Sequence, residues 1–576
     1  MMGRSKTSAD SRVAPCGYDA VPESELSATL DGHRRGDLEV GKSRLVAVGA
    51  VFALAFLGVM ARMGDLAIGD MAGTAHALAA VGGQSGEALR GDIRDRNGVV
   101  LATTAPMYSL TANPQEIRDV KGAARSLAAL LPELGETEIT RRLSSEQRFV
   151  YLSRHLTPRQ AAAAHRLALP GLDLMVQPKR LYPHGPLTGH VVGFSDIDTH
   201  GLSGVERSQD RDLASGAPLD LSLDLRVQHL VAEELAATIE QFEAIGGAAI
   251  VLDVDSGEVL SMVSLPTFDP TAPAEADKSQ RFNRASLGVY EMGSIFKLFT
   301  AAMALDSGAA NLTDSFDATK PIRVGRHTIR DFKPEKRWLS LPEVLVHSSN
   351  IGSARVAVAL GRERQQSYLG RLGLLERAPL ELPENGRPIA PGVWRDASTM
   401  TISFGHGLAV SPMQTAAAVA ALVNGGYKVQ PSLIRGGASG PRERILEKET
   451  SETMRWLMRL VVKRGTGGKS DVPGYFIGGK TGTSEKLVEG RYDRDRRMAS
   501  FVGAFPMDAP RYLVLATIDE PKPQKHTFGY ATGGWVAAPL VGRIVQRTAP
   551  LLGISPRDAS HDLIETATTV PVALRR

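Results

Sequence analysis

The stretch "YEMGSIFKLFTAAMALDSG", residues 290–308, starts with a glycine-containing turn and continues as an apolar segment that we expect to form a helix. Its first turn holds two polar side chains, Ser294 and Lys297. Residues three apart lie on one face of a helix, with Cβ atoms about 5–6 Å apart, so the lysine amine can reach the serine hydroxyl. A neutral amine could accept the serine proton, provided that burial or nearby cations lower the pKa of Lys297. The free N–H groups at a helix start would also favour negative charge on an attacked carbonyl.

The pattern S-x-x-K alone is weak support for catalysis. It arises by chance roughly once in a chain of this length, and a serine at a helix start is commonly just a cap. In this sequence, however, Lys297 is the only lysine preceded by serine at the third position. It also lies in an apolar segment rather than on a charged surface.

Two later motifs supply further polar groups. The stretch "VHSSNIG" carries Ser348 and Asn350, whose hydroxyl and amide can both point into one cleft from a loop between helices. The stretch "GGKTGTSEK" carries Lys480, Thr481, Gly482 and Thr483 on a predicted strand. A glycine there lets a backbone approach a ligand closely, and the lysine and threonine groups can bind a carboxylate. Each motif alone could equally be a turn or a sheet edge.

Composition excludes several classes of protein. The 576 residues are 43% hydrophobic and 23% charged, which is typical of a folded chain with more than one domain. The net charge of +4 and the absence of a basic stripe with interleaved aromatics argue against a nucleic-acid partner. A single cysteine, Cys16, excludes an intramolecular disulfide. No His, Asp or Glu cluster predicts a metal, and we expect no cofactor.

The N-terminal region predicts a membrane anchor. Residues 45–61, "LVAVGAVFALAFLGVMA", are uncharged and would span about 26 Å as a helix, close to the hydrocarbon thickness of a bilayer. Basic residues precede this span, and after Arg62 none follows until Arg90, so the N-terminus is expected in the cytoplasm and the rest of the chain outside. The same stretch is also compatible with a buried helix or a cleaved signal peptide.

The rest of the chain predicts an α+β fold. Residues 90–104, "RGDIRDRNGVVLATT", indicate a hairpin, and 114–165 look helical. Residues 220–245 change from strand alternation to an amphipathic helix. The strongest hairpin signal is 246–270, and 290–425 are mainly helical. Further expected elements are antiparallel strands at 474–483, 497–505 and 511–519 and a helix at 534–552. Strands, then helices, then strands favour helices packed on an antiparallel sheet.

The three motifs in the order S-x-x-K, S-x-N, K-T-G resemble the penicillin-recognising serine acyl-transferases. The resemblance covers roughly residues 85–550 and includes "RGDIRDRNGVVLA" and "GLSGVERSQDRDL" of a dimerisation, or pedestal, module. It also includes "YEMGSIFK", "FVGAFP" and "YATGGWVAAPLVGRIV". There is no room for a glycosyltransferase module between the expected anchor and the pedestal, so the resemblance is to class B penicillin-binding proteins. The C-terminal stretches are most similar to the cell-division (FtsI) type.

The resemblance implies a serine β-lactamase/transpeptidase-like domain, an antiparallel sheet flanked by helices, preceded by a mixed, β-rich pedestal and one transmembrane helix. The implied boundaries are a disordered tail at 1–43, an anchor at 44–62, a pedestal at 63–225, a transpeptidase domain at 226–553 and a C-terminal tail at 554–576. Localisation would be the inner membrane with a periplasmic catalytic domain. Implied partners are D-Ala-D-Ala stem peptides, β-lactams, an FtsW-type lipid-II polymerase and other division proteins.

The resemblance also implies roles for the motif residues. Ser294 would attack the penultimate D-Ala carbonyl, and Lys297 would be the base. Ser348 and Asn350 would move a proton and hold the acyl-enzyme, and Lys480 would add positive charge. The substrate carboxylate would be bound by residues of the third motif, namely Thr481, Gly482 and Thr483. The backbone N–H groups of Ser294 and Thr483 would form the oxyanion hole.

Two positions depart from the family pattern. Met292 stands where the family commonly has proline and Ile295 where it has threonine, and neither change removes a reacting group. A β-lactamase or D,D-carboxypeptidase would use the same motifs with water as acceptor. The sequence is also compatible with an elongation-type class B transpeptidase, a membrane-anchored β-lactam sensor or a catalytically idle scaffold.

Overall fold

The computed structural model describes residues 53–60, 89–325, 327–437, 442–488 and 491–566. The chain divides into two units, residues 1–80 and 81–576. In the first unit only residues 53–60 are described, and they are helical. The predicted tail at 1–43 and most of the predicted anchor at 44–62 therefore lie outside the described residues. Within the part that is described, no helix has the length and apolar character needed to cross a membrane.

The pedestal region is built on a mixed five-stranded sheet. Its strands are β1 (Ile93–Arg94), β2 (Val100–Ala112), β3 (Val150–Leu156), β4 (Leu172–Leu181) and β5 (Leu219–Asp220). The order is β3-β2-β1-β5 with β4 also on β2, and the β1–β5 pair is parallel. The predicted hairpin at 90–104 is confirmed, and Gly98 supplies its turn with a φ of +85°.

The predicted helical stretch at 114–165 is only partly correct. It contains helices α2 (Val120–Leu130), α3 (Gly135–Leu143) and α4 (Pro158–Arg166), and strand β3 lies between the last two. In β3, Leu152 and Leu156 are buried in a core that the strand shares with the three helices. Three short helices complete the pedestal: α5 (Gly189–Val192), α6 (Gly204–Ser208) and α7 (Asp210–Ala214).

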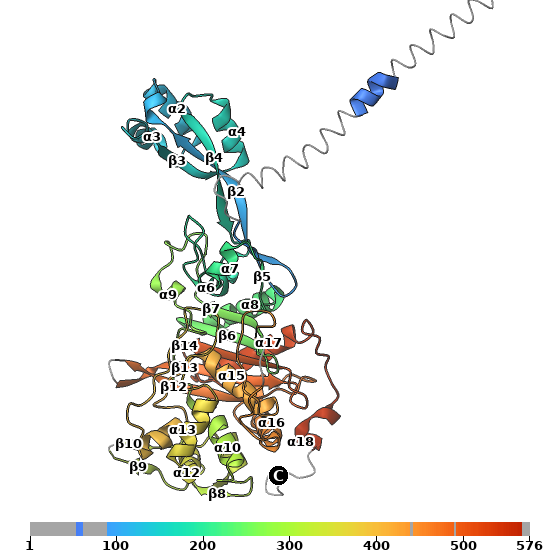
Figure 1. Cartoon of the computed structure of the whole chain (residues 1–576). Coiled ribbons are helices and arrows are strands. Elements are labelled where there is room, and N and C mark those ends of the chain that lie inside the picture. Colours follow the sequence, from blue (N-terminus) through green and yellow to red (C-terminus); the bar gives the residue numbers. More distant parts are fainter. Residues whose placement is uncertain (1–52, 61–88, 326, 438–441, 489–490, 567–576) are drawn as a thin grey trace, which may run out of the picture. The chain divides into compact units, whose positions relative to one another are not determined.

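The C-terminal part holds a second, fully antiparallel five-stranded sheet (Figure 1). Its strands are β6 (Gly246–Asp253), β7 (Val259–Leu265), β12 (Gly478–Val488), β13 (Arg491–Phe505) and β14 (Tyr512–Asp519). The order is β12-β13-β14-β6-β7, so the predicted hairpin and the three predicted late strands are confirmed as neighbours. Strand β12, which carries the third motif, lies at one edge of this sheet.

The central strands β6 and β14 are buried on both faces, and their alternate residues enter different cores. On β6, Ile250 and Leu252 belong to one core, whereas Ala249 and Val251 belong to the other. Helices α8 (Leu225–Gln241) and α17 (Ala537–Thr548) cover the second face, and α15 (Pro412–Val423) and α16 (Lys448–Arg464) cover the first. Burial on both faces fixes the register of these central strands, since a one-residue slip would exchange the two cores.

A helical subdomain follows Ser294 along the chain. Its helices are α10 (Phe296–Asp306), α11 (Leu341–Val346), α12 (Asn350–Leu360), α13 (Arg362–Arg371) and α14 (Asp396–Ile402). Small strand pairs join it: β8 (Ser315–Asp317) with β11 (Trp338–Ser340), and β9 (Ile322–Val324) with β10 (His327–Ile329). The remaining short helices are α9 (Lys278–Arg281) and α18 (Leu563–Thr566). Helix α10 is buried almost throughout, so its first turn is held rigidly.

Candidate active site

Ser294 lies in a single 3₁₀ turn, Gly293–Ile295, that leads directly into α10. Gly293 has a φ of +55°, and a Cβ on it would come within 2.6 Å of the Thr483 carbonyl oxygen. A Cβ on Gly482 would likewise come within 2.5 Å of the Met292 carbonyl oxygen. Two glycines thus let the start of α10 and strand β12 approach at backbone distance, and this contact places the third motif beside the serine.

Lys297 stands at the centre of the polar cluster. Its Nζ lies 2.6 Å from Ser294 Oγ, 2.7 Å from Asn350 Oδ1 and 3.3 Å from Ser348 Oγ. The side chain is buried, and desolvation lowers the pKa of Lys297 well below its usual value, with the charge of Lys480 adding to the effect. The first two motifs therefore meet at one amine whose environment favours the neutral, proton-accepting form.

The second motif is held by a loop that the sequence did not reveal. Asp331 accepts hydrogen bonds from the Ser349 hydroxyl (2.7 Å) and the Ile351 N–H (2.9 Å). The Asn350 amide donates to the Arg330 carbonyl at 2.9 Å, which leaves its oxygen directed at Lys297. Ser348 adopts a φ of +55°, an uncommon conformation that turns its hydroxyl toward the two lysines. Nothing in the local sequence around Asp331 indicates this role.

Lys480 lies opposite Lys297, on β12. Its Nζ is 3.0 Å from Ser348 Oγ and 3.4 Å from Thr481 Oγ1. Burial lowers the pKa of Lys480 to about 7. The two lysines are thus bridged by the Ser348 hydroxyl, which forms a short path for a proton between them.

The threonines of β12 are positioned by two other segments. Thr481 Oγ1 lies 2.7 Å from Thr466 Oγ1, in the turn after α16, and the Gly533 N–H donates to Thr483 Oγ1 at 3.0 Å. Because Thr483 accepts this bond, its own hydroxyl proton can be donated to a carboxylate. Thr466 and Gly533 are site-forming residues that sequence reasoning missed, since each is distant in sequence from the motif that it supports.

A further polar group lies next to the turn that carries Ser294. Glu291 Oε1 accepts from the Gly407 N–H at 2.7 Å and from the Tyr492 hydroxyl at 3.0 Å. The His406 ring packs against Phe404 and Tyr492, and burial lowers the pKa of His406. Sequence reasoning missed this cluster as well. Among the described residues, no group of three or more His, Cys, Asp or Glu side chains is placed to hold a metal.

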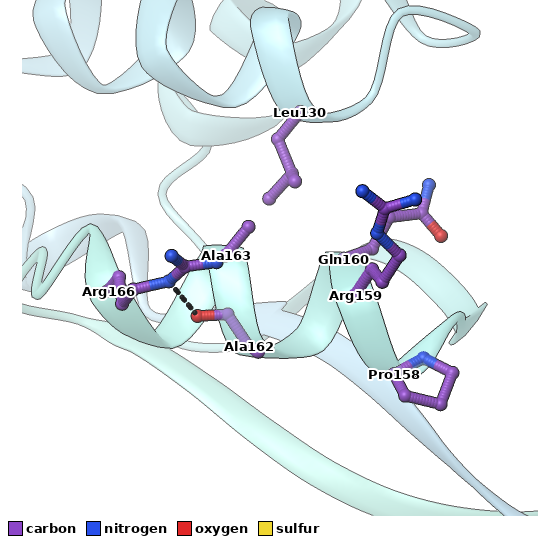
Figure 2. A pocket seen from close by; sticks show the side chains of 7 residues that line it. All are labelled: Leu130, Pro158, Arg159, Gln160, Ala162, Ala163 and Arg166. Carbon is purple, nitrogen blue, oxygen red and sulfur yellow. Dashed lines mark hydrogen bonds between the residues drawn. The ribbon is translucent and has the colours of Figure 1, made fainter.

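A shallow surface pocket of the described chain lies in the pedestal and not at these residues. It has a volume of about 550 Å³ and is open to solvent between α2 and α4 (Figure 2). Its lining comprises Leu130, Pro158, Arg159, Gln160, Ala162, Ala163 and Arg166. None of these residues belongs to the three motifs, so this pocket is separate from the cluster around Ser294.

The polar cluster around Ser294 and the antiparallel sheet beside it agree with the protein family that comparison with known families shows. The family model described as penicillin binding protein transpeptidase domain matches residues 247–546 of the sequence. The family model described as penicillin-binding protein dimerisation domain matches residues 85–216. The chain therefore belongs to the penicillin-binding-protein transpeptidase family.

Individual relatives agree with this assignment. The chain is 40% identical to the probable peptidoglycan D,D-transpeptidase FtsI of Caulobacter vibrioides, over 89% of each chain. It is 34% identical to the probable peptidoglycan D,D-transpeptidase PenA of Neisseria meningitidis, over 81% of this chain and 85% of the relative. The crystal structure of penicillin-binding protein 3 of Mycobacterium tuberculosis, complexed with aztreonam, is similar with a TM-score of 0.65 and 25% identity, over 83% of this chain and 98% of that one.

Proposed function

We propose that this protein is a septal peptidoglycan D,D-transpeptidase that cross-links stem peptides through an acyl-enzyme on Ser294. The observation that carries the assignment of residues is the position of the buried Lys297 amine, within 3.3 Å of Ser294 Oγ, Ser348 Oγ and Asn350 Oδ1. The transpeptidase relatives, one of them of the FtsI type, support the class of reaction.

The first half-reaction is acylation. Ser294 Oγ attacks the carbonyl of the penultimate D-Ala, and neutral Lys297 accepts the hydroxyl proton. The negative oxygen that forms is stabilised by the backbone N–H groups of Ser294 and Thr483. The C–N bond to the terminal D-Ala then breaks. Its amine takes up the proton, supplied from Lys297 through Ser348, and an ester on Ser294 remains.

The second half-reaction transfers the acyl group. An acceptor amine attacks the ester carbonyl, loses its proton to Lys297, and forms the new peptide bond as the C–O bond to Ser294 breaks. The oxygen of Ser294 recovers the proton. Lys480, Thr481 and Thr483 hold the substrate carboxylate in both steps, with Gly482 allowing close approach of the backbone. Asn350 orients the acyl chain and Lys297.

The proposal extends to location and partners. Residues 44–62 would anchor the chain in the inner membrane, with residues 1–43 in the cytoplasm and the catalytic part in the periplasm, because the apolar span follows basic residues. The pedestal at 63–225 would contact an FtsW-type lipid-II polymerase and other division proteins. β-Lactams would acylate Ser294 as substrate mimics. No specific observation favours an elongation-type enzyme, a sensor or a scaffold.

The test is labelling of the full-length chain, in detergent, with a fluorescent penicillin, followed by intact mass and peptide mapping. We expect one stable adduct on Ser294, and none in Ser294→Ala, because Ser294 Oγ is the hydroxyl that the Lys297 amine contacts at 2.6 Å. Rapid release of hydrolysed drug would instead indicate a β-lactamase. Absence of any adduct from a folded wild-type protein would contradict the enzyme assignment.

A further inference from the structure

An exposed aromatic cluster lies on the loop that precedes α17. Phe528 is 79% exposed and Tyr530 is 38% exposed. Both rings contact Trp535: Phe528 meets it edge-on with centroids 5.7 Å apart, and Tyr530 stacks on it with centroids 6.2 Å apart. Lys469 Nζ lies 4.1 Å from the centre of the Trp535 ring. Trp535 therefore supports the rings of Phe528 and Tyr530 from one side, and both rings are exposed to solvent.

The backbone holds Phe528 in an unusual conformation. The turn is closed by the bonds Phe528 N–H to Lys525 O (3.1 Å), Gly529 N–H to Gln524 O (3.2 Å) and Tyr530 N–H to Thr527 O (2.9 Å). Within this turn Phe528 has a φ of +53° and a ψ of +34°, a left-handed conformation that bulky side chains rarely adopt. Neither the strained backbone of Phe528 nor the exposure of its ring stabilises the folded chain. We therefore expect the ring to contribute to the binding of a ligand.

The same loop is joined directly to the substrate-binding strand. Gly533, three residues after Tyr530, donates its N–H to Thr483 Oγ1 at 3.0 Å. A Cβ on Gly533 would come within 2.3 Å of the Ser500 carbonyl oxygen and 2.4 Å of the Gly482 carbonyl oxygen, so the loop packs on β12 and β13 at backbone distance. The loop that carries the aromatic rings is thus attached at Gly533 to the strand of the third motif.

We propose that Phe528 and Tyr530 form a platform that binds a sugar ring of the glycan strand carrying the stem peptide. The proposal rests on the proposed function, because the stem peptide that would bind at Thr481 and Thr483 is attached to a glycan strand. A pyranose ring presents a face of C–H groups that stacks on an aromatic face, and hydroxyls at its rim. The exposed rings offer such a face, and the Tyr530 hydroxyl offers a polar partner beside it.

The test compares two ligands on the full-length chain. Fluorescently labelled glycan strands freed of stem peptides by an amidase report the platform, and fluorescent penicillin, which has no sugar, reports Ser294. We expect the wild-type chain to bind the peptide-free glycan, and Phe528→Ala to weaken that affinity about tenfold while penicillin acylation stays within about twofold. Phe528→Tyr should retain glycan binding, since the aromatic face remains.

Phe149→Ala is the matched control, because Phe149 is another exposed aromatic, at 47%, in the pedestal. Equal glycan affinity in the wild type and in Phe528→Ala would overturn the platform and favour a protein partner for these rings. Loss of penicillin acylation in Phe528→Ala would also overturn the proposed platform, since the ring would then be required for the reaction at Ser294. A wild-type chain that is acylated but binds no glycan refutes the platform alone, whereas an unacylated wild type refutes the proposed function.

Discussion

At the scale of single residues, the two buried lysines make acylation depend on pH in two directions. As the proposed base, Lys297 would act only when neutral, so we expect the acylation efficiency to rise as pH increases through its lowered pKa. In the proposed mechanism Lys480 would support carboxylate binding only when charged, so we expect the efficiency to fall as pH rises through the Lys480 pKa of about 7. We expect a bell-shaped profile for acylation of the free enzyme by subsaturating penicillin.

Lys480→Gln separates the two limbs. The alkaline limb should disappear and efficiency should drop on the order of 100-fold, because the charge that binds the carboxylate is lost. The acid limb should move to higher pH, since Lys480 no longer depresses the pKa of Lys297. The measurement is the labelling rate constant at low penicillin concentration from about pH 5.5 to about 9.5. An unchanged acid limb in the variant would show that the two lysines are not coupled.

At the scale of elements, helix α16 is tied to the strand of the third motif through Arg459. This buried guanidinium contacts Asp562 at 2.7 Å and Asp471 at 2.6 Å, and it donates to the Ile477 carbonyl at 2.8 Å, directly before β12. Asp562 lies in the segment 554–576, which was predicted to be a tail, and in the structure it is buried beside α18. The C-terminal segment thus neutralises a buried charge that contacts the residue directly before β12.

We expect Asp562→Ala to lower the free energy of unfolding of the catalytic region by about 3 kcal/mol, because it removes one of two carboxylates from a buried arginine. Urea unfolding followed by loss of penicillin labelling gives the midpoint shift. Glu452→Ala, which breaks the exposed pair with Lys448 at 3.6 Å, is the control and should leave the midpoint nearly unchanged. Equal shifts for the two variants would mean that burial of the Arg459 pair is unimportant.

The positions of single helices and strands could be predicted from the sequence, whereas contacts between segments distant in the sequence could not. The spacing of Ser294 and Lys297 and the hairpin at 246–270 were predictable, since helix and strand periods act over a few residues. The order that places β14 beside β6 joins segments about 260 residues apart, and no local period encodes it. The contacts of Asp331 and Thr466 with the motif residues could not be predicted for the same reason. Strand β3 was not predicted, because its seven residues lie between two helical stretches and interrupt their helical sequence pattern only briefly.

At the scale of the whole molecule, the pedestal is joined into one structure by a buried carboxylate. Glu206 on α6 is fully buried and lies 2.7 Å from Arg90, before β1, and 2.7 Å from Arg180 on β4. These segments are separated by up to 116 residues in sequence. The neighbouring Gly204 N–H donates to Glu384 at 3.1 Å, in the catalytic region, so the same short helix contacts both parts.

Glu206→Gln keeps the shape of the side chain but leaves two buried guanidiniums without this counter-charge. We expect hydrogen exchange in peptides covering β1 and β4 to accelerate on the order of 100-fold, since breaking a buried ion pair costs about 3 kcal/mol of local stability. Glu138→Gln is the matched control: Glu138 is also held by two arginines, at 2.6 Å and 2.7 Å, but on the protein surface, where solvent compensates the loss. Exchange in β6 and β14, and penicillin labelling of Ser294, should stay close to wild type, because the ion-pair partners of Glu206 lie in the pedestal. Faster exchange in both sheets would show instead that the pedestal and the catalytic region unfold as one cooperative unit.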